Sequence, residues 1–165
     1  MTDAVIVSTA RTPIGKAYRG AFNDTEAPVL GGHVVRHAVE RAGADPSEVD
    51  DVILGLAAPQ GSQGYNIGRL SGTTAGLPEE VSGMQIDRMC SSGMIAIGLA
   101  ARAVMTGEQA IIVAGGLESI SLTQNKHKNA YRSVSKAVLE QSPHMYMPMI
   151  ETAEVVADRY DISRE

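Results

Sequence analysis

The sequence predicts an α/β fold, in which a mostly parallel sheet carries helices on both faces. In roughly the first 121 residues, short β-branched or apolar runs alternate with segments whose apolar residues recur at helical spacing. Glycine and proline separate the two kinds of segment. The 165 residues include 17 glycines but only one Phe and no Trp. That composition favours close-packed layers of Ala, Val, Ile and Leu, and right-handed crossovers then make successive strands parallel.

Each element is predicted from a local pattern. Strands are expected at residues 4–9, 51–58, 81–89 and 109–116, and helices at 27–42, 67–75 and 94–105. The β-branched run at 4–9 is expected to be a first strand buried on both faces. The run at 109–116 is very apolar and is expected to be a central strand. Gly43 is predicted to end the first helix, and Asn66 to cap the second.

The remaining segments differ in character. The Gly-rich loop at 59–64 lacks both a following Lys-Ser/Thr and GxGxxG spacing, so it is predicted to be a flexible connection and not a phosphate site. Residues 122–148 show no clear period and are expected to leave the sheet, whereas 152–160 show helical spacing. Ser163 resembles a helix N-cap with Glu165 in its first turn. Since the chain stops there, we expect it to be the first part of a longer protein.

Composition and charge argue against several functions. The formal charge of −5 and the scattered Lys and Arg residues disfavour nucleic acid as a partner. A single cysteine cannot form an internal disulfide, which favours a reducing compartment. We find no apolar run of the roughly 18 residues that a membrane span needs, and the N-terminus lacks the pattern of a signal peptide. We therefore expect a soluble, cytoplasmic protein.

Cys90 is the candidate catalytic residue. It lies between the predicted strand at 81–89 and the apolar run at 94–105, so the sequence predicts a turn from strand to helix at the thiol. A lone cysteine is usually a small buried hydrophobe. Here the small residues at 91–93 would let a substrate approach the backbone closely, and a helix N-terminus favours the nucleophilic thiolate. Ligands of parallel sheets also bind beyond the carboxyl ends of the strands, where this turn is expected.

The histidines show no clear catalytic pattern. They are His33, His37, His127 and His144. The first two are four residues apart on a predicted helix, a spacing that can hold a metal ion. The sequence has no HExxH motif and no carboxylate in register with the pair. We therefore predict no metal site and expect both side chains to lie on a solvated helix face.

Four motifs together resemble those of the thiolase family. The segment around the cysteine, Asp87-Arg-Met-Cys-Ser-Ser-Gly93, is similar to the family's acyl-enzyme signature. The other motifs are Val7–Gly15, Ala114–Ser119, and Thr152–Glu154 with Ile162–Glu165. They occur in the family's order over essentially the whole chain. The chain therefore resembles the first two-fifths of an acetyl-CoA acetyltransferase or 3-ketoacyl-CoA thiolase.

The resemblance implies a thiolase-like layered fold, with residues 1–121 as an incomplete N-terminal α/β domain and 122–165 as the start of a loop domain that covers CoA. It implies that Cys90 accepts an acyl group during reversible condensation and thiolysis of acetyl-CoA and 3-ketoacyl-CoA. Met149 matches a methionine that lines the acyl and pantetheine pocket; as part of a Met-rich stretch, it could also be core filler. The resemblance further implies fatty acid metabolism, no cofactor besides the CoA substrates, and a homodimer or homotetramer.

Departures from the family pattern leave alternatives open. Asp87 stands where the family more often has Asn, Ser91 where it has Gly, and Pro148 where biosynthetic members often carry His. The family's activating His, second Cys and oxyanion-hole Asn have no counterpart here, so we expect the chain alone to be inactive in thiolysis of acetoacetyl-CoA. One alternative is a ketoacyl synthase, because Asp87-x-x-Cys-Ser-Ser92 is also similar to the signature of that class. Another is a truncated thiolase-like protein without catalysis.

Overall fold

The structure, a computed structural model, describes residues 3–165 and forms two compact units. The first unit extends to Lys128, and the second comprises Asn129–Glu165. A short helix, α4 (Ile120–Thr123), belongs to the first unit. The two compact units divide after residue 128, and the boundary between domains after residue 121, expected from the loss of a clear period and from the family resemblance, stays a prediction.

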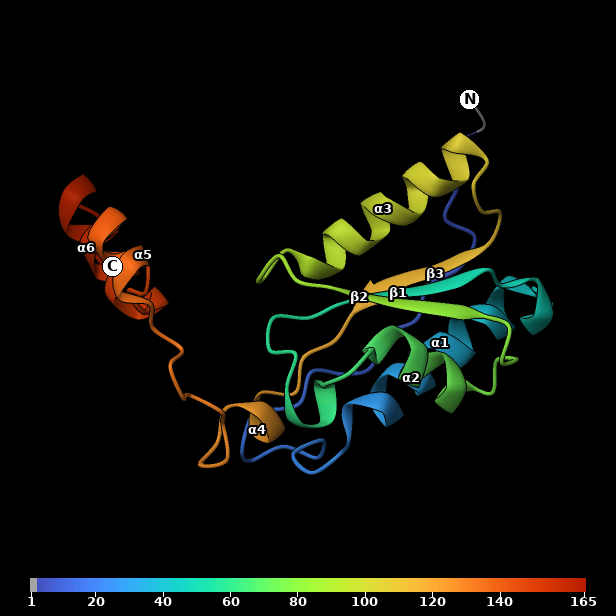
Figure 1. The fold of residues 1–165 in the computed structure, drawn as a ribbon, viewed down its shortest axis with the longest axis horizontal. Coiled ribbons are helices and arrows are strands. Elements are labelled where there is room, and N and C mark those ends of the chain that lie inside the picture. The colour runs from blue at the N-terminus through green and yellow to red at the C-terminus, as the bar shows by residue number, and fades with distance from the viewer. Residues whose placement is uncertain (1–2) are drawn as a thin grey trace. The chain divides into compact units, whose positions relative to one another are not determined.

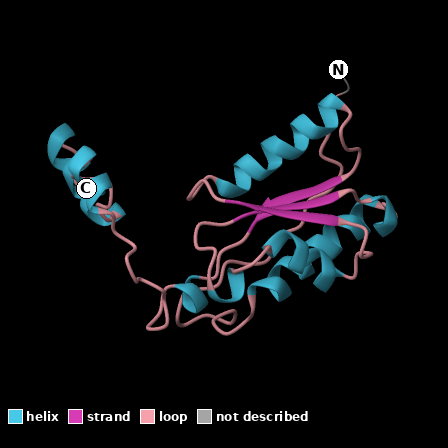
Figure 2. Ribbon diagram, viewed as in Figure 1, coloured by secondary structure: helices cyan, strands magenta, loops and turns pink. Residues whose placement is uncertain are grey.

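The first unit is a parallel sheet with helices on both faces, as the sequence predicts (Figures 1 and 2). The strands are β1 (Asp51–Gly55), β2 (Ser82–Ile86) and β3 (Ile112–Gly116), in the order β2–β1–β3. The helices are α1 (Ala27–Ala42), α2 (Ile67–Ala75) and α3 (Ser92–Thr106). In Figure 1, α3 covers one face of the sheet, and α1 and α2 cover the other.

Strand β1 is the centre of the core. Its side chains alternate between the two faces, as the period of a strand requires. Val52 and Leu54 join the larger apolar cluster beneath α1 and α2, whereas Ile53 packs with Ala96 and Ala100 of α3. Within residues 3–165, β1 is hydrogen-bonded to a strand on both sides and β3 on one side only, so the prediction that 109–116 is central is wrong. An apolar strand is one whose faces are covered by helices, and helices can cover an edge strand as well as a central one.

The helices on the lower face begin and end where local signals place them. The bounds of α1 match the prediction, and Gly43 ends it in the left-handed region with φ 66°. Asn66 caps α2 by accepting a hydrogen bond from the Arg69 N–H. Glycine also lets the two helices approach closely, because a Cβ atom at Gly32 would stand 2.7 Å from the Cβ of Thr74.

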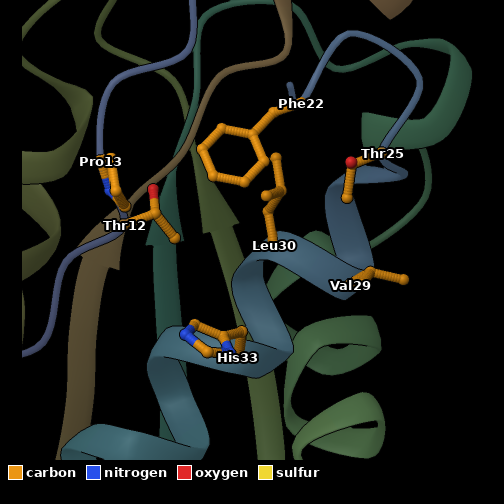
Figure 3. A pocket seen from close by; sticks show the side chains of 7 residues that line it. All are labelled: Thr12, Pro13, Phe22, Thr25, Val29, Leu30 and His33. Carbon is orange, nitrogen blue, oxygen red and sulfur yellow. The ribbon is translucent and has the colours of Figure 1, made fainter. Parts of the chain in front are cut away.

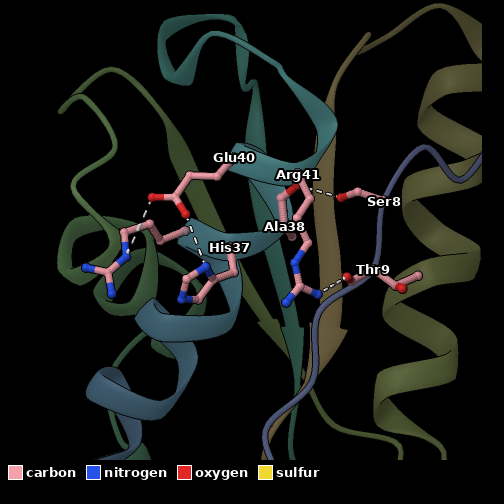
Figure 4. A network of polar contacts seen from close by, with 7 residues as sticks. Ser8, Thr9, His37, Ala38, Glu40 and Arg41 are labelled. Carbon is pink, nitrogen blue, oxygen red and sulfur yellow. Dashed lines mark hydrogen bonds and ion pairs between the residues drawn. The ribbon is translucent and has the colours of Figure 1, made fainter.

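The segment at 4–9 is not a strand, so this prediction is wrong. Val5, Ile6 and Val7 are 75%, 76% and 72% exposed. The segment is tied to α1 by two polar contacts to the backbone: Ser8 Oγ donates to the Ala38 carbonyl, and the Arg41 guanidinium donates to the Thr9 carbonyl at 2.8 Å (Figure 4). A β-branched run becomes a buried strand only when other elements pair with it and cover it.

The second unit contains two helices, α5 (Lys136–Gln141) and α6 (Met149–Tyr160). Helix α6 contains the predicted helix 152–160 and begins three residues before it. Asp161 ends it with φ 52°. Among the described residues of this unit, none in either helix is fully buried. Residues 162–165 are not helical, and because only two residues follow Ser163, the helix predicted after it stays a prediction.

The stretch Met89–Thr106 is long and apolar enough to cross a membrane, with a mean hydropathy of 1.4 over 18 residues. The expectation that the chain has no such run is therefore wrong. The stretch contains so few charged residues that, by length and composition alone, it could span a membrane. Most of it forms α3, whose inner face packs on the sheet through Ala96 and Ala100. A helix that packs in a protein core can be as long and as apolar as a membrane-spanning helix.

At the amino ends of the strands, Asp50 fastens all three together. Its carboxylate accepts hydrogen bonds from the N–H groups of Ile111 and Ala110, at 3.0 and 2.7 Å. Its backbone carbonyl accepts from the N–H and hydroxyl of Ser82. The hydrogen bonds from Ile111 and Ala110 lower the pKa of Asp50 below its ordinary value of 3.8, because they favour the charged form.

Because the folded-state pKa of Asp50 is lowered, its contribution to stability is present above 3.8 and is lost as the pH falls through the folded value. We expect Asp50→Asn to lower the free energy of unfolding by about 1 kcal/mol at neutral pH, since the group is exposed to solvent. Urea unfolding at a series of pH values should show the difference from wild type shrinking below 3.8.

Asp51→Asn is the matched control, because the Asp51 carboxylate accepts only the N–H of the adjacent Val52 among the described residues. We expect a smaller effect on stability from this change. If the difference in free energy of unfolding between wild type and Asp50→Asn is the same at every pH, the charge of Asp50 does not stabilise the fold.

Candidate active site

Cys90 lies in a sharp turn between β2 and α3. The strand ends at Ile86, the helix begins at Ser92, and the thiol between them is exposed. This confirms the predicted order of strand, turn and helix. Met89, directly before the cysteine, adopts φ 49°. Non-glycine residues rarely adopt this left-handed conformation, so the turn is strained at the residue that aims the thiol.

Hydrogen bonds hold this turn on several sides. The Asp87 carboxylate accepts from the Met89 N–H at 2.7 Å. The Arg88 carbonyl accepts from both the N–H and the hydroxyl of Ser91. The Ser92 hydroxyl lies 2.8 Å from the Arg88 N–H nitrogen and 2.6 Å from the Met89 carbonyl oxygen. The N–H of Cys90 is not among the donors in these contacts.

Three glycines, which we call the glycine seat, bring the start of α3 against the carboxyl ends of β1 and β3. They are Gly55, Gly93 and Gly116. A Cβ atom on Gly55 would collide with the Ser92 carbonyl and lie 2.5 Å from the nitrogen of Gly93. A Cβ atom on Gly116 would lie 2.9 Å from the Gly55 oxygen. Backbone therefore packs on backbone where α3 begins, and at Gly55 and Gly116 only glycine permits this approach.

The loop after β1 is fixed beside this seat by a buried amide. Gln63 is fully buried, and its amide nitrogen donates to the Ala58 carbonyl at 2.9 Å and to the Glu118 carboxylate at 2.5 Å. Its amide oxygen accepts from the Ser119 N–H. The other carboxylate oxygen of Glu118 accepts from the Ala57 N–H at 2.7 Å. The prediction of a flexible connection at 59–64 is therefore wrong.

The histidines of the first helix lie away from this turn. His33 and His37 are on α1, across the sheet from α3, with ring centroids 4.5 Å apart. His37 contacts Glu40 at 3.1 Å (Figure 4). Between residues 3 and 165, no group of three His, Cys, Asp or Glu side chains is placed to hold a metal ion. His127 lies in a loop of the first unit, and His144 in the second unit.

A cavity of about 220 Å³ lies between the 12–25 segment and α1, also on the face away from α3 (Figure 3). Phe22 and Leu30 meet across it, and His33 is at its lower end. It holds no cysteine and no carboxylate. The cavity therefore offers an apolar recess without a nucleophile.

Met149, the predicted substrate-binding residue, begins α6 in the second unit and is 70% exposed. Cys90 belongs to the first unit, so the structure describes the two predicted site residues in separate units. Nothing in either unit contradicts the sequence-based roles, and both remain predictions.

Sequence reasoning missed the residues that support the thiol. Ser92 was noted only as a small residue, although a serine at a helix start is well placed for backbone hydrogen bonds. Gly55 carried a signal, because a glycine within an apolar strand often marks a close backbone approach. Gln63 carried none, since the residues it binds, Glu118 and Ser119, are more than fifty positions away in the chain.

Comparison with known proteins identifies the family. The family described as "Thiolase, N-terminal domain" matches residues 4–165, so the chain belongs to it. The chain is 41% identical over 165 residues to 3-ketoacyl-CoA thiolase of Bacillus subtilis, covering 100% of this chain and 42% of the relative. It is 40% identical to acetyl-CoA acetyltransferase of Cupriavidus necator, covering 100% of this chain and 44% of that protein.

A solved structure agrees with this assignment. The crystal structure of the Bacillus anthracis acetyl-CoA acetyltransferase superposes with a TM-score of 0.80 at 36% identity, covering 99% of this chain and 43% of that chain. The thiolase resemblance and the α/β fold class are therefore confirmed, and the family match decides against a ketoacyl synthase. The chain spans less than half the length of these relatives.

Proposed function

We propose that this chain carries the acyl-accepting cysteine of a thiolase, with acetyl-CoA and 3-ketoacyl-CoA as substrates. The observation that carries the proposal is the exposed Cys90 thiol in a strained turn at the start of α3, within a chain of the thiolase family. Thiolate is the nucleophilic form of cysteine, and a helix N-terminus favours it.

The proposed chemistry is acyl transfer through a thioester. The Cys90 thiolate attacks the thioester carbonyl of acyl-CoA, and the CoA thiolate leaves as the S-acyl bond to Cys90 forms. In thiolysis of 3-ketoacyl-CoA, Cys90 attacks the 3-keto carbon, the bond between C2 and C3 breaks, and protonation of the released carbanion gives acetyl-CoA. Free CoA then attacks the acyl-Cys90 thioester, so that the shortened acyl-CoA leaves and the Cys90 thiolate is restored. The Cys90 N–H can donate to the carbonyl oxygen as it gains charge, because the other hydrogen bonds of the turn do not use it.

Further parts of the proposal concern the second unit and the setting of the enzyme. We propose that the region from about residue 122 begins a loop domain over CoA and that Met149 lines the acyl and pantetheine pocket; its 70% exposure is compatible with a substrate contact. We also propose a cytoplasmic homodimer or homotetramer that acts in fatty acid metabolism. The single free thiol supports a reducing compartment, and the names of the relatives support a role in acyl-CoA metabolism, whereas the oligomeric state follows only from the family resemblance.

The experiment that tests the function is acetyl loading of the purified 165-residue chain. We expect incubation with excess acetyl-CoA to add one acetyl group, measured by intact mass, and peptide mapping to place it on Cys90. We expect loading without turnover of acetoacetyl-CoA, because the structure places His33 and His37 on the opposite side of the sheet from the thiol.

Iodoacetamide provides the control for thiol reactivity. If iodoacetamide alkylates Cys90 stoichiometrically while acetyl-CoA leaves it unmodified, the thiol is accessible and does not accept acetyl groups. That result would contradict the proposed function and favour a thiolase-like chain without acyl chemistry.

A further inference from the structure

A buried hydroxyl belongs to Ser92, two residues after the cysteine. Ser92 is 2% exposed, and its Oγ atom is within hydrogen-bond distance of three backbone groups from two segments. The three are the Arg88 nitrogen at 2.8 Å, the Met89 oxygen at 2.6 Å and the Leu56 oxygen at 3.2 Å. A serine hydroxyl can accept from the Arg88 N–H while it donates its single proton to the Met89 or the Leu56 carbonyl.

These contacts close a ring of chain around Cys90. Arg88 and Met89 precede the cysteine, and Ser92 follows it, so this side chain ties the two ends of the turn together. It does so alongside two backbone hydrogen bonds, from the Ser91 N–H to the Arg88 carbonyl and from the Ser92 N–H to the Met89 carbonyl. The ring includes Met89 in its left-handed conformation, which is sterically unfavourable for a residue with a Cβ atom. Such a conformation persists only where its surroundings determine it. The Asp87 and Ser91 side chains also bind the turn, but Asp87 lies on its exposed side and the Ser91 contact is solvent-exposed.

The third contact anchors the ring to the sheet. The Leu56 carbonyl and the Ala57 N–H belong to one peptide group directly after β1. Ser92 contacts the carbonyl of that peptide, and the Glu118 carboxylate accepts from its N–H at 2.7 Å. The hydroxyl is therefore connected through one peptide group to the segment after β3, and the turn cannot tilt without disturbing these hydrogen bonds.

We propose that Ser92 is a positioning residue, whose hydroxyl holds the Arg88–Ser92 turn so that the Cys90 sulfur stays at the N-terminus of α3. The importance of this sulfur position for catalysis rests on the proposed function. The role of Ser92 in holding the sulfur there does not depend on that function. Loss of the hydroxyl would let Met89 relax and move the thiol away from the helix terminus.

The test compares an anionic and a neutral reagent on the only thiol of the chain. A helix N-terminus attracts anions, so a thiol held there should favour iodoacetate relative to iodoacetamide. We expect Ser92→Ala to lower the ratio of the two alkylation rates about threefold. Ser92→Thr, which keeps the hydroxyl, should restore the ratio. Ser91→Ala removes a neighbouring hydroxyl with one exposed contact and should leave the ratio unchanged, and Arg88 is present in every variant.

A second measurement needs no variant. The Arg88 amide should exchange with deuterated solvent at least about tenfold more slowly than an unstructured amide in the wild-type chain, because Ser92 Oγ accepts its proton. An unchanged alkylation ratio in folded Ser92→Ala, or unprotected exchange at Arg88, would overturn the proposal. If the wild-type chain fails to accept an acetyl group while Ser92→Ala still lowers the alkylation ratio about threefold, the proposed function is contradicted and the role of Ser92 stands.

Discussion

Cys90→Ser is expected to abolish acetyl transfer from acetyl-CoA to the chain. The substitution replaces the only thiol with a hydroxyl that is almost entirely protonated at neutral pH. A serine becomes a useful nucleophile only beside a general base, and no histidine or carboxylate is hydrogen-bonded to residue 90 in the described part of the chain. We expect loading, measured by intact mass, to fall on the order of a hundredfold or more.

Ser91→Ala is the matched control for this result. Ser91 is adjacent to the cysteine, and its hydroxyl makes one hydrogen bond, to the Arg88 carbonyl at 3.0 Å. We expect acetyl loading within about twofold of wild type, since the N–H of Ser91 still holds that carbonyl. Acetyl groups that persist in Cys90→Ser and map to lysine would show that the label reports surface acetylation instead of a site.

Gly55→Ala is expected to be among the most destabilising single substitutions in the first unit. Its methyl group would meet the Ser92 carbonyl and the Gly93 nitrogen, which are backbone atoms that cannot rotate away. Overpacking against rigid backbone should lower the free energy of unfolding by about 3 kcal/mol or more. Urea unfolding followed by circular dichroism measures this loss.

Gly98→Ala supplies the opposite control in α3. A Cβ atom at Gly98 meets nothing within 4 Å among the described atoms. Alanine at this helical position should raise stability by about 0.5–1 kcal/mol, because it reduces the freedom of the unfolded chain. Equal effects of the two substitutions would show that the close packing at Gly55 does not exist in solution.

The parts of the fold that sequence predicted well depend on near neighbours. The bounds of α1, the Asn66 cap and the left-handed Gly43 all follow from interactions within a few residues. Strand order and strand pairing depend on distant segments. For that reason the edge position of β3 and the unpaired segment at 4–9 could not be read from apolar composition.

The candidate site divides in the same way. Cys90 could be predicted because a strand, a turn, small residues and a helix follow one another along the chain. The residues that support the cysteine turn could not be predicted, because Gln63 and Glu118 are hydrogen-bonded although they are 55 positions apart in the sequence. The strain at Met89 also has no sequence signal, since methionine shows no preference for a left-handed conformation.

The glycine seat has a consequence for redesign of this site. Because backbone rests on backbone at Gly55, Gly93 and Gly116, the distance from the start of α3 to the sheet depends on no side-chain rotamer. Residues of the turn whose side chains face solvent, such as Arg88, can then be varied to change the walls seen by an acyl chain while the start of α3 keeps its place on the sheet. Substrate range and nucleophile placement are thereby separable traits, open to independent selection in a library.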